Sequence, residues 1–294
     1  MMCRKKVIII GGGFAGIQAA RRLDPKLFEV TLFDKINHHQ FQPLFYQVAT
    51  SQIEPANISF PFRHIFRNEK HVQIRFAEIS HIFPDQNRIS SGIGDFYYDI
   101  LIIATGCRTN FFGNRNICKH SFALKTTYDA IKIRNHTLKT FEKIISLKEE
   151  EREPFLNLVI VGAGATGVEL AGAYAEIRKN VLPKDYHRID FSKFQIYLVE
   201  GSRYTLNTMS NKAKTASEKY LREMGVQIFT ERFVTAYDGN ILTLNNGETI
   251  KTKTVIWAAG VTGNYINGLP HDCRTQTNRI KVDRINKVTG SDNI

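Results

Sequence analysis

Residues 7–16 read VIIIGGGFAG, and residues 158–167 read LVIVGAGATG. In each stretch a short run of aliphatic residues leads into glycines spaced as G-x-G-x-x-G, and a segment rich in helix-forming residues follows. Continuous apolar strands of this kind suit a parallel sheet that is covered on both faces. The repeat therefore predicts two units that are built on the same plan.

The glycine spacing predicts a site for the pyrophosphate of a dinucleotide in each copy. The first glycine permits a tight turn, the second lets the backbone approach the pyrophosphate, and the third lets helix and strand pack closely. The N–H groups and the positive dipole end of the following helix then hold the anion. The six glycines are Gly11, Gly13, Gly16, Gly162, Gly164 and Gly167.

An acidic residue follows the second predicted strand of each copy, where the motif places a partner for ribose hydroxyls. Asp34 follows residues 30–33 (VTLF), and Glu200 follows residues 196–199 (IYLV). A carboxylate at Glu200 accepts from a free 2′-hydroxyl and repels a 2′-phosphate, which favours NADH over NADPH. Arg203, three residues on, is the neighbouring group that would favour the phosphate.

Further elements complete an α/β pattern. Strands are predicted over residues 97–105 and 254–261, and each contains an Ala-x-Gly sequence near its end, at residues 104–106 and 258–260. A helix is predicted over residues 124–147. On its buried face we expect Tyr128, Ile131, Leu138, Phe141 and Ile145. The alternation predicts two Rossmann-like dinucleotide-binding domains, the second inserted in the first.

The predicted domain limits follow from these motifs. We expect residues 1–112 to form the first part of an FAD-binding domain and residues 263–294 to form its second part, which is incomplete. Residues 113–262 are predicted to form the NAD-binding domain.

The composition restricts the class of protein. The 294 residues are 43% hydrophobic and 23% charged, which excludes disordered and coiled-coil chains. The net charge of +12 is compatible with nucleic acid, an anionic membrane surface or anionic cofactors. Residues 62–76 carry Arg63, Arg67, Lys70 and Arg75 without a nucleic-acid recognition motif. We interpret them as a solvated, mildly membrane-attracting face and predict no nucleic-acid partner.

The four cysteines, Cys3, Cys107, Cys118 and Cys273, form no C-x-x-C pair. This argues against a zinc site, a dithiol or a disulfide framework, and we predict no metal. The apolar run at residues 7–10 is too short for an export signal, and no run reaches the ~18 residues of a membrane span. A soluble or peripheral protein is expected.

Longer strings resemble one family. They are residues 37–50 (NHHQFQPLFYQVAT), residues 164–172 (GATGVELAG) and residues 257–261 (WAAGV). The chain resembles the flavoproteins with two dinucleotide-binding domains and, within them, the type II NADH:quinone oxidoreductases. The resemblance runs from residue 7 to about residue 262. It implies that FAD binds the first unit, that NADH binds the second, and that electrons pass through flavin to a membrane quinone.

The resemblance also implies the site residues. Glu169 is expected as the catalytic residue, near the meeting point of nicotinamide and flavin; the alternative is a surface acid in the first turn of its helix, favoured there by the dipole. The residues expected at the cofactors, besides the six glycines and the two acids, are Phe14, Ala15, Lys35, Gln47, Thr50, Ala104, Thr105, Gly106, Thr166, Ala259 and Gly260.

Quinone and an anionic membrane surface are the expected partners, with a homodimer left open. The family resemblance implies a cytoplasmic protein bound peripherally at the inner face of the cytoplasmic membrane. Residues 37–52 contain no cysteine, which excludes a dithiol relay beside the flavin. Two alternatives stay open: a flavin-dependent NAD(P)H reductase of a soluble acceptor, and a truncated protein that binds NADH without FAD.

The resembling family continues past residue 294 with a strand ending in Gly-Asp, an Ala-Gln pair beside the quinone and amphipathic membrane helices. The present sequence ends in residues 291–294 (SDNI), which resemble the approach to that strand. We expect a chain shortened at its C-terminus. Both a fragment and a naturally short protein with an incomplete FAD site remain open.

Overall fold

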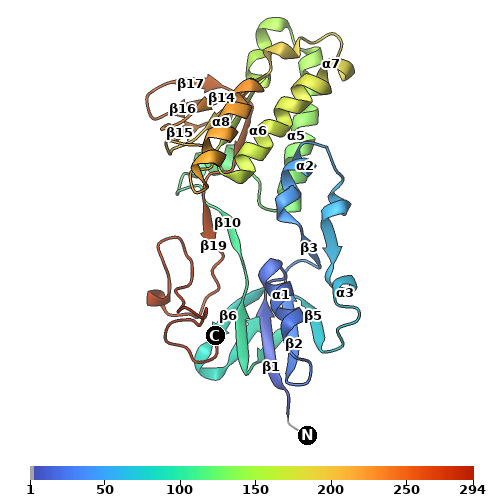
Figure 1. Cartoon of the computed structure of the whole chain (residues 1–294), viewed down its shortest axis with the longest axis vertical. Coiled ribbons are helices and arrows are strands. Elements are labelled where there is room, and N and C mark those ends of the chain that lie inside the picture. The colour runs from blue at the N-terminus through green and yellow to red at the C-terminus, as the bar shows by residue number, and fades with distance from the viewer. Residues whose placement is uncertain (1–2) are drawn as a thin grey trace. The chain divides into compact units, whose positions relative to one another are not determined.

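The computed structural model describes residues 3–294, which divide into two compact units (Figure 1). The first unit comprises residues 3–40, Ile58–Arg108 and Val261–Ile294, and the second comprises Phe41–Asn57 and Thr109–Gly260. Strands β10 (Cys107–Thr109) and β19 (Val261–Gly263) pair with each other where the chain leaves the first unit and returns to it. The grouping of Phe41–Asn57 with the second unit has no counterpart in the sequence patterns.

The first unit is built on a four-stranded parallel sheet with the order β5-β2-β1-β9. Its strands are β1 (Lys5–Ile10), β2 (Phe28–Asp34), β5 (Val72–Phe76) and β9 (Ile100–Ile103), and α1 (Phe14–Arg22) connects β1 to β2. An antiparallel meander precedes β9 and consists of β6 (Ile79–Phe83), β7 (Arg88–Ser91) and β8 (Gly94–Tyr97). A small antiparallel pair, β3 (His38–Gln40) and β4 (Ser59–Pro61), precedes the short helix α3 (Phe62–Ile65).

The second unit repeats this plan with one more strand. Its parallel sheet has the order β11-β18-β12-β13-β14, formed by β11 (Phe122–Ala123), β18 (Thr254–Trp257), β12 (Asn157–Val161), β13 (Gln195–Val199) and β14 (Gln227–Phe229). Its meander consists of β15 (Val234–Tyr237), β16 (Ile241–Leu244) and β17 (Thr249–Lys251). Its helices are α2 (Phe45–Ala49), α4 (Arg115–His120), α5 (Thr127–Ser146), α6 (Ala165–Asn180), α7 (Leu182–Asp185) and α8 (Asn211–Glu223).

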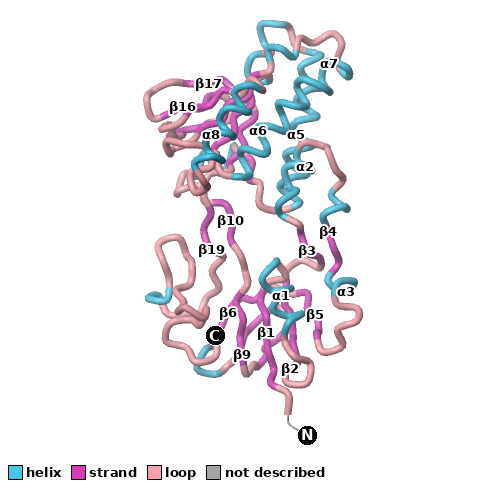
Figure 2. Tube along the Cα trace, viewed as in Figure 1, coloured by secondary structure: helices cyan, strands magenta, loops and turns pink. Residues whose placement is uncertain are grey.

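The two units share one topology, which Figure 2 shows as strands and helices in alternation. β1 and β12 lie inside their sheets, the next strand of the chain (β2 or β13) pairs on one side, and the strand after the meander (β9 or β18) pairs on the other. Strand β1 carries four consecutive buried aliphatic residues and β12 is buried throughout. The predicted α/β class and the predicted pair of Rossmann-like units are confirmed.

The apolar face predicted for α5 is buried only in part: Phe141 is buried and Ile131 is half-buried. Tyr128 is 64% exposed, and Leu138 and Ile145 are also exposed. The face that packs inward instead includes Ala130, Ile133 and Ile144, together with Thr127, Thr140 and Phe141. The inward residues, at positions 130, 133, 140, 141 and 144, follow the helical period along a face that shares only Phe141 with the predicted one. The helix begins with a capping box formed by Thr126 and Asp129.

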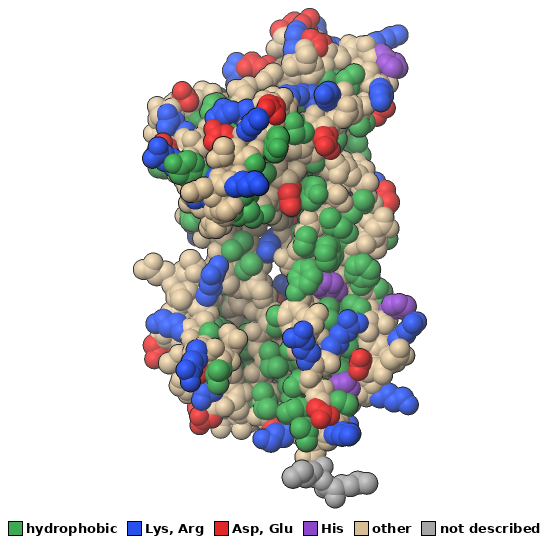
Figure 3. Space-filling view, in the orientation of Figure 1, with side chains coloured by type: hydrophobic (Ala, Val, Ile, Leu, Met, Phe, Trp, Pro, Cys, Tyr) green, Lys and Arg blue, Asp and Glu red, His purple; other side chains and the backbone are tan. Residues whose placement is uncertain are grey.

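Basic side chains are spread widely over the surface. On the face that Figure 3 shows, Lys and Arg side chains are interspersed with Asp and Glu. Arg63, Arg67, Lys70 and Arg75 are all exposed. Among residues 3–294, no helix combines the length and the apolar character needed to cross a membrane.

Candidate dinucleotide sites

The first glycine turn follows β1 and requires glycine at two positions. Gly11 has a φ of +107°, and a Cβ atom on it would overlap the carbonyl oxygen of Ala104, directly after β9. A Cβ atom on Gly16 would overlap the carbonyl oxygen of Gly11. The turn therefore packs against the end of β9 on one side and against the start of α1 on the other.

The middle glycine of the same turn faces open space. A Cβ atom on Gly13 would have no other protein atom within 4 Å, and Gly13 is the N-cap residue of α1. Within the described part of the chain, no side chain caps this helix and no acid lies in its first turn. A helix N-terminus of this kind offers backbone N–H groups and a positive dipole end to an anion.

The second glycine turn reproduces this geometry. Gly162 has a φ of +101°, and a Cβ atom on it would lie 2.7 Å from the Cα atom of Ala259, two residues after the end of β18. A Cβ atom on Gly167 would overlap the carbonyl oxygen of Gly162. Gly164 faces open space and precedes α6, whose N-terminus has no side-chain cap among residues 3–294.

The acid of each unit is fixed by two backbone donors. Asp34 accepts the N–H of Gly12 at 2.6 Å on one carboxylate oxygen and the N–H of Ile36 at 2.8 Å on the other. Glu200 accepts the N–H groups of Ala163 and Ser202 in the same way, at 2.6 and 2.8 Å. Each carboxylate is thus held rigidly beside its glycine turn, with further lone pairs available for ribose hydroxyls.

A cavity of about 330 Å³ opens in the first unit at the carboxyl ends of the strands. Gly11, Asp34, Lys35 and Thr105 line it, as the sequence motifs lead one to expect. The remaining polar lining residues were not predicted; they are Glu78, Arg108, Asn264 and Tyr265.

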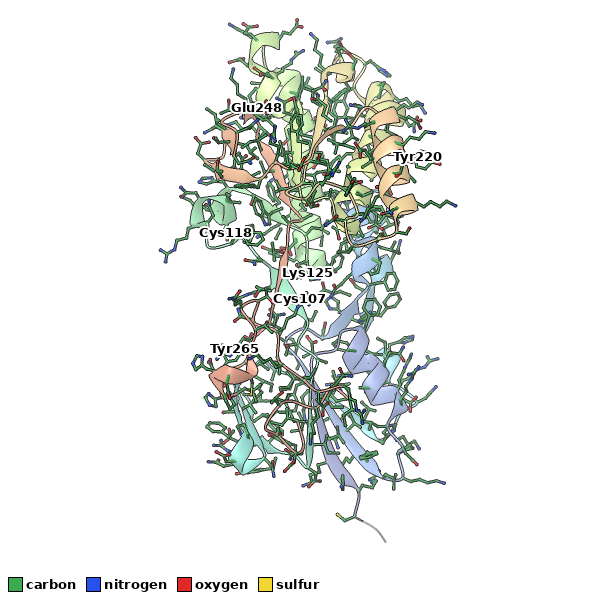
Figure 4. The ribbon with its side chains drawn as sticks, turned by 60° about the vertical axis from the view of Figure 1, so that its left-hand side comes forward. Cys107, Cys118, Lys125, Tyr220, Glu248 and Tyr265 are labelled. Atoms are coloured by element: carbon green, nitrogen blue, oxygen red, sulfur yellow. The ribbon has the colours of Figure 1, made fainter. Side chains whose placement is uncertain are left out.

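Asn264, in the segment that returns to the first unit, is hydrogen-bonded to Thr105, which the motifs predict at the cavity. The Asn264 amide donates to the Thr105 carbonyl at 2.8 Å, and the Thr105 hydroxyl donates to the Asn264 carbonyl at 3.0 Å. Tyr265, labelled in Figure 4, carries the guanidinium of Arg274 over its ring at 3.2 Å from the centroid. The two hydrogen bonds between Thr105 and Asn264 join residues 159 positions apart, so no local pattern reveals them.

The other residues expected at the flavin fall in both units. Phe14 and Ala15 are exposed at the start of α1, and Lys35 is 3.9 Å from Glu78. Gln47 and Thr50 belong to the second unit, where α2 packs against α5 and α6. Thr50 is buried and its hydroxyl donates to the Tyr46 carbonyl at 2.8 Å.

The family model of pyridine nucleotide-disulphide oxidoreductases matches residues 5–294. The chain belongs to this family.

Individual relatives narrow the comparison. The type II NADH:quinone oxidoreductase Ndh of Mycobacterium tuberculosis is 33% identical over 97% of this chain and 63% of its own length. The type II NADH:quinone oxidoreductase of Haemophilus influenzae is 27% identical over 99% of this chain and 70% of its own length. The structure of NDH2 from Plasmodium falciparum in complex with NADH matches with a TM-score of 0.84 at 24% identity, over 89% of this chain and 56% of that one. This last likeness concerns the fold, and the chain spans less than two thirds of the M. tuberculosis relative.

The cysteines of the described residues form no disulfide. Cys3, Cys107, Cys118 and Cys273 are all unpaired. Within residues 3–294, no group of three or more His, Cys, Asp or Glu side chains is arranged to hold a metal ion.

Glu169 differs from its sequence-based description in one respect. It lies beyond the first turn of α6, which contains no acid, so the helix dipole gives no special reason for an acid there. Its carboxylate is exposed and has no hydrogen-bond or ionic partner among residues 3–294. Partial burial raises its pKa above the usual value. Thr166, one turn earlier, is also exposed, and Gly106 and Gly260 have positive φ values of +67° and +75°.

Proposed function

We propose that this chain binds FAD at the first glycine turn and NADH at the second, and that it transfers electrons from NADH to a quinone. The observation that carries the proposal is the duplicated site: two glycine turns, each with an uncapped helix N-terminus and a backbone-fixed acid. The similarity to the M. tuberculosis type II NADH:quinone oxidoreductase over 97% of the chain supports the quinone as acceptor.

The residues of the first unit fit a dinucleotide. Gly13 leaves room for a pyrophosphate at the N-terminus of α1, and Asp34 accepts from ribose hydroxyls. Arg108, which is exposed and also lines the cavity, adds a positive charge to the lining. When bound, FAD supplies the chemistry that accepts a hydride from NADH and passes electrons to quinone.

In the second unit, Gly164 and Glu200 would hold the pyrophosphate and the adenosine ribose of NADH in the same way. Glu169 would position the nicotinamide or hold a proton destined for the quinone, a role suited to an unpartnered carboxyl of raised pKa. The net charge of +12 supports attraction to an anionic membrane surface at the cytoplasmic side.

Two glycine variants test which nucleotide each unit binds. Gly13→Val should abolish FAD binding and leave NADH affinity unchanged, and Gly164→Val should do the reverse. Both variants should fold, because a Cβ atom at either position meets no other protein atom within 4 Å. Gly92→Val is the matched control, since Gly92 has similar open space in the turn between β7 and β8.

The measurements are quenching of FAD fluorescence and enhancement of NADH fluorescence on titration with each variant. A Gly13→Val protein that retains FAD while Gly164→Val loses it would reverse the assignment. Unchanged FAD binding in both variants would contradict the proposed FAD site.

A further inference from the structure

The peptide group that joins Gly12 to Gly13 is held from the side opposite the proposed anion site. The N–H of Gly12 donates to Asp34 at 2.6 Å. The carbonyl oxygen of Gly12 is 3.1 Å from Nδ1 of His39, on β3. A carbonyl oxygen can only accept, so Nδ1 of His39 carries the proton in this contact.

The orientation of this carbonyl decides where the next N–H group points. In a planar trans peptide the C=O and the N–H point in opposite directions, and the described chain contains no cis peptide. Because the Gly12 carbonyl points to His39, the N–H of Gly13 points away from His39. A flip of this peptide would turn a carbonyl oxygen in place of an N–H toward an anion at the helix N-terminus, which repels it.

The second glycine turn holds the equivalent peptide with a different donor. The N–H of Ala163 donates to Glu200 at 2.6 Å, as Gly12 donates to Asp34. The carbonyl of Ala163 accepts the backbone N–H of Leu206 at 2.8 Å. Leu206 has a φ of +47°, a backbone conformation that a leucine rarely adopts. Both turns therefore fix the same peptide, one with an imidazole and the other with a backbone amide.

The imidazole of His39 is itself well fixed. His39 is only 7% exposed, and its ring meets the ring of Phe14 edge-on, with centroids 4.9 Å apart. Its backbone is paired with that of Phe60 in the β3–β4 ribbon. Phe62, which follows β4, packs against Gly12 so closely that a Cβ atom there would overlap its ring. The pair of strands β3 and β4 thus positions two side chains, His39 and Phe62, against Gly12 of the first glycine turn.

We propose that His39 is a positioning residue of the first dinucleotide site: its Nδ1–H holds the Gly12 carbonyl so that the Gly13 N–H faces the ligand's pyrophosphate. The inference rests on the proposed function, because it takes FAD as the ligand of the first turn. It makes His39 matter for the flavin site alone, since Leu206 performs the same task at the other turn.

Three variants separate this role from ordinary packing. His39→Phe keeps a ring against Phe14 but lacks the donor, and it should raise the dissociation constant for FAD by roughly three- to tenfold, the worth of one hydrogen bond. His39→Asn places an amide N–H at the position of Nδ1 and should restore most of the affinity. His38→Phe is the matched control, because the hydrogen bond described for the His38 ring among residues 3–294 is the local one to Asn37, at 3.0 Å.

The FAD dissociation constant from fluorescence quenching is the readout, with NADH affinity measured on the same samples to report the second unit. Weakened FAD binding in His39→Phe, recovery in His39→Asn and constant NADH affinity support the proposal. FAD affinity equal to wild type in His39→Phe, or equal loss in His39→Phe and His39→Asn, overturns it. A wild-type chain that takes up no FAD contradicts the proposed function itself, and the inference falls with it.

Discussion

At the scale of single residues, nucleotide choice in the second unit depends on Glu200. Its two carboxylate oxygens already accept the N–H groups of Ala163 and Ser202, so the charge is held in place when a ribose arrives. Glu200→Gln keeps an acceptor and removes the negative charge. We expect the preference for NADH over NADPH to narrow by about 1–3 kcal/mol, the size of a charged hydrogen bond.

Dissociation constants for both nucleotides, measured at one ionic strength, check this prediction. A ratio that stays the same in the variant would show that Glu200 is not the ribose acid. Glu218→Gln on α8 is a suitable control, since Glu218 pairs with Arg222 on the helix surface.

Replacement of Glu169 by Gln should change the turnover rate and the melting temperature in opposite directions. Burial raises its pKa, so the folded state favours the neutral carboxyl. The stability that this preference contributes is present below the unfolded-state pKa and is lost as the pH rises through the folded-state pKa. Glu169→Gln should therefore raise the melting temperature slightly at neutral pH and leave it unchanged in acid.

Turnover should fall in the same variant if Glu169 moves or holds a proton, and acid or base groups typically contribute about 10²–10⁴-fold. The rates of flavin bleaching by NADH and of reoxidation by quinone, measured separately, show which step it serves. Wild-type rates in both steps would leave Glu169 without a catalytic role.

At the scale of elements, α6 contains two glycines with opposite requirements. A Cβ atom on Gly167 would overlap the carbonyl oxygen of Gly162, whereas one on Gly172 would make ordinary contact with Leu221 at 3.9 Å. Gly167→Ala should lower the free energy of unfolding by at least ~1–3 kcal/mol. Gly172→Ala should raise it by ~0.5–1 kcal/mol through helix propensity.

Urea unfolding of the two variants beside wild type tests the packing of strand and helix at the second turn. Because both substitutions add one methyl group to the same helix, each controls for the other. Equal stability changes in the two variants would contradict the close approach of α6 to the turn.

The sequence predicts these elements well where the physical requirement is local. A glycine that needs a positive φ, such as Gly11, or an acid at the end of a strand, such as Asp34, leaves its mark within a short stretch. Contacts between distant segments have no local sequence signal. The bond from Asn264 to Thr105 and the bond from Leu206 to Ala163 depend on how the folded chain brings these residues together. The inward face of α5 was predicted only in part for a related reason, because the neighbouring elements decide which apolar side chains are covered. Ile133 and Ile144 are buried, whereas Ile145 is exposed.

At the scale of the whole molecule, the chain is one topology used twice. The strand order around β1 matches that around β12. Gly11 closely approaches the backbone just after β9, and Gly162 closely approaches the backbone just after β18. The duplicated plan places two candidate dinucleotide sites on one chain, which is what the proposed transfer of a hydride between two cofactors requires. We propose that FAD binds the site of the first unit and that NADH binds the site of the second.

The most direct test of that claim is an anaerobic absorbance titration of the FAD-loaded 294-residue chain with NADH. The two visible flavin bands should appear when the chain is loaded with FAD, and they should bleach on addition of about one equivalent of NADH. In Gly164→Val the bands should appear but fail to bleach, since this variant keeps FAD and loses NADH. Flavin bands that persist in the wild-type chain with excess NADH would contradict the account, as would full bleaching of Gly164→Val at the wild-type NADH concentration.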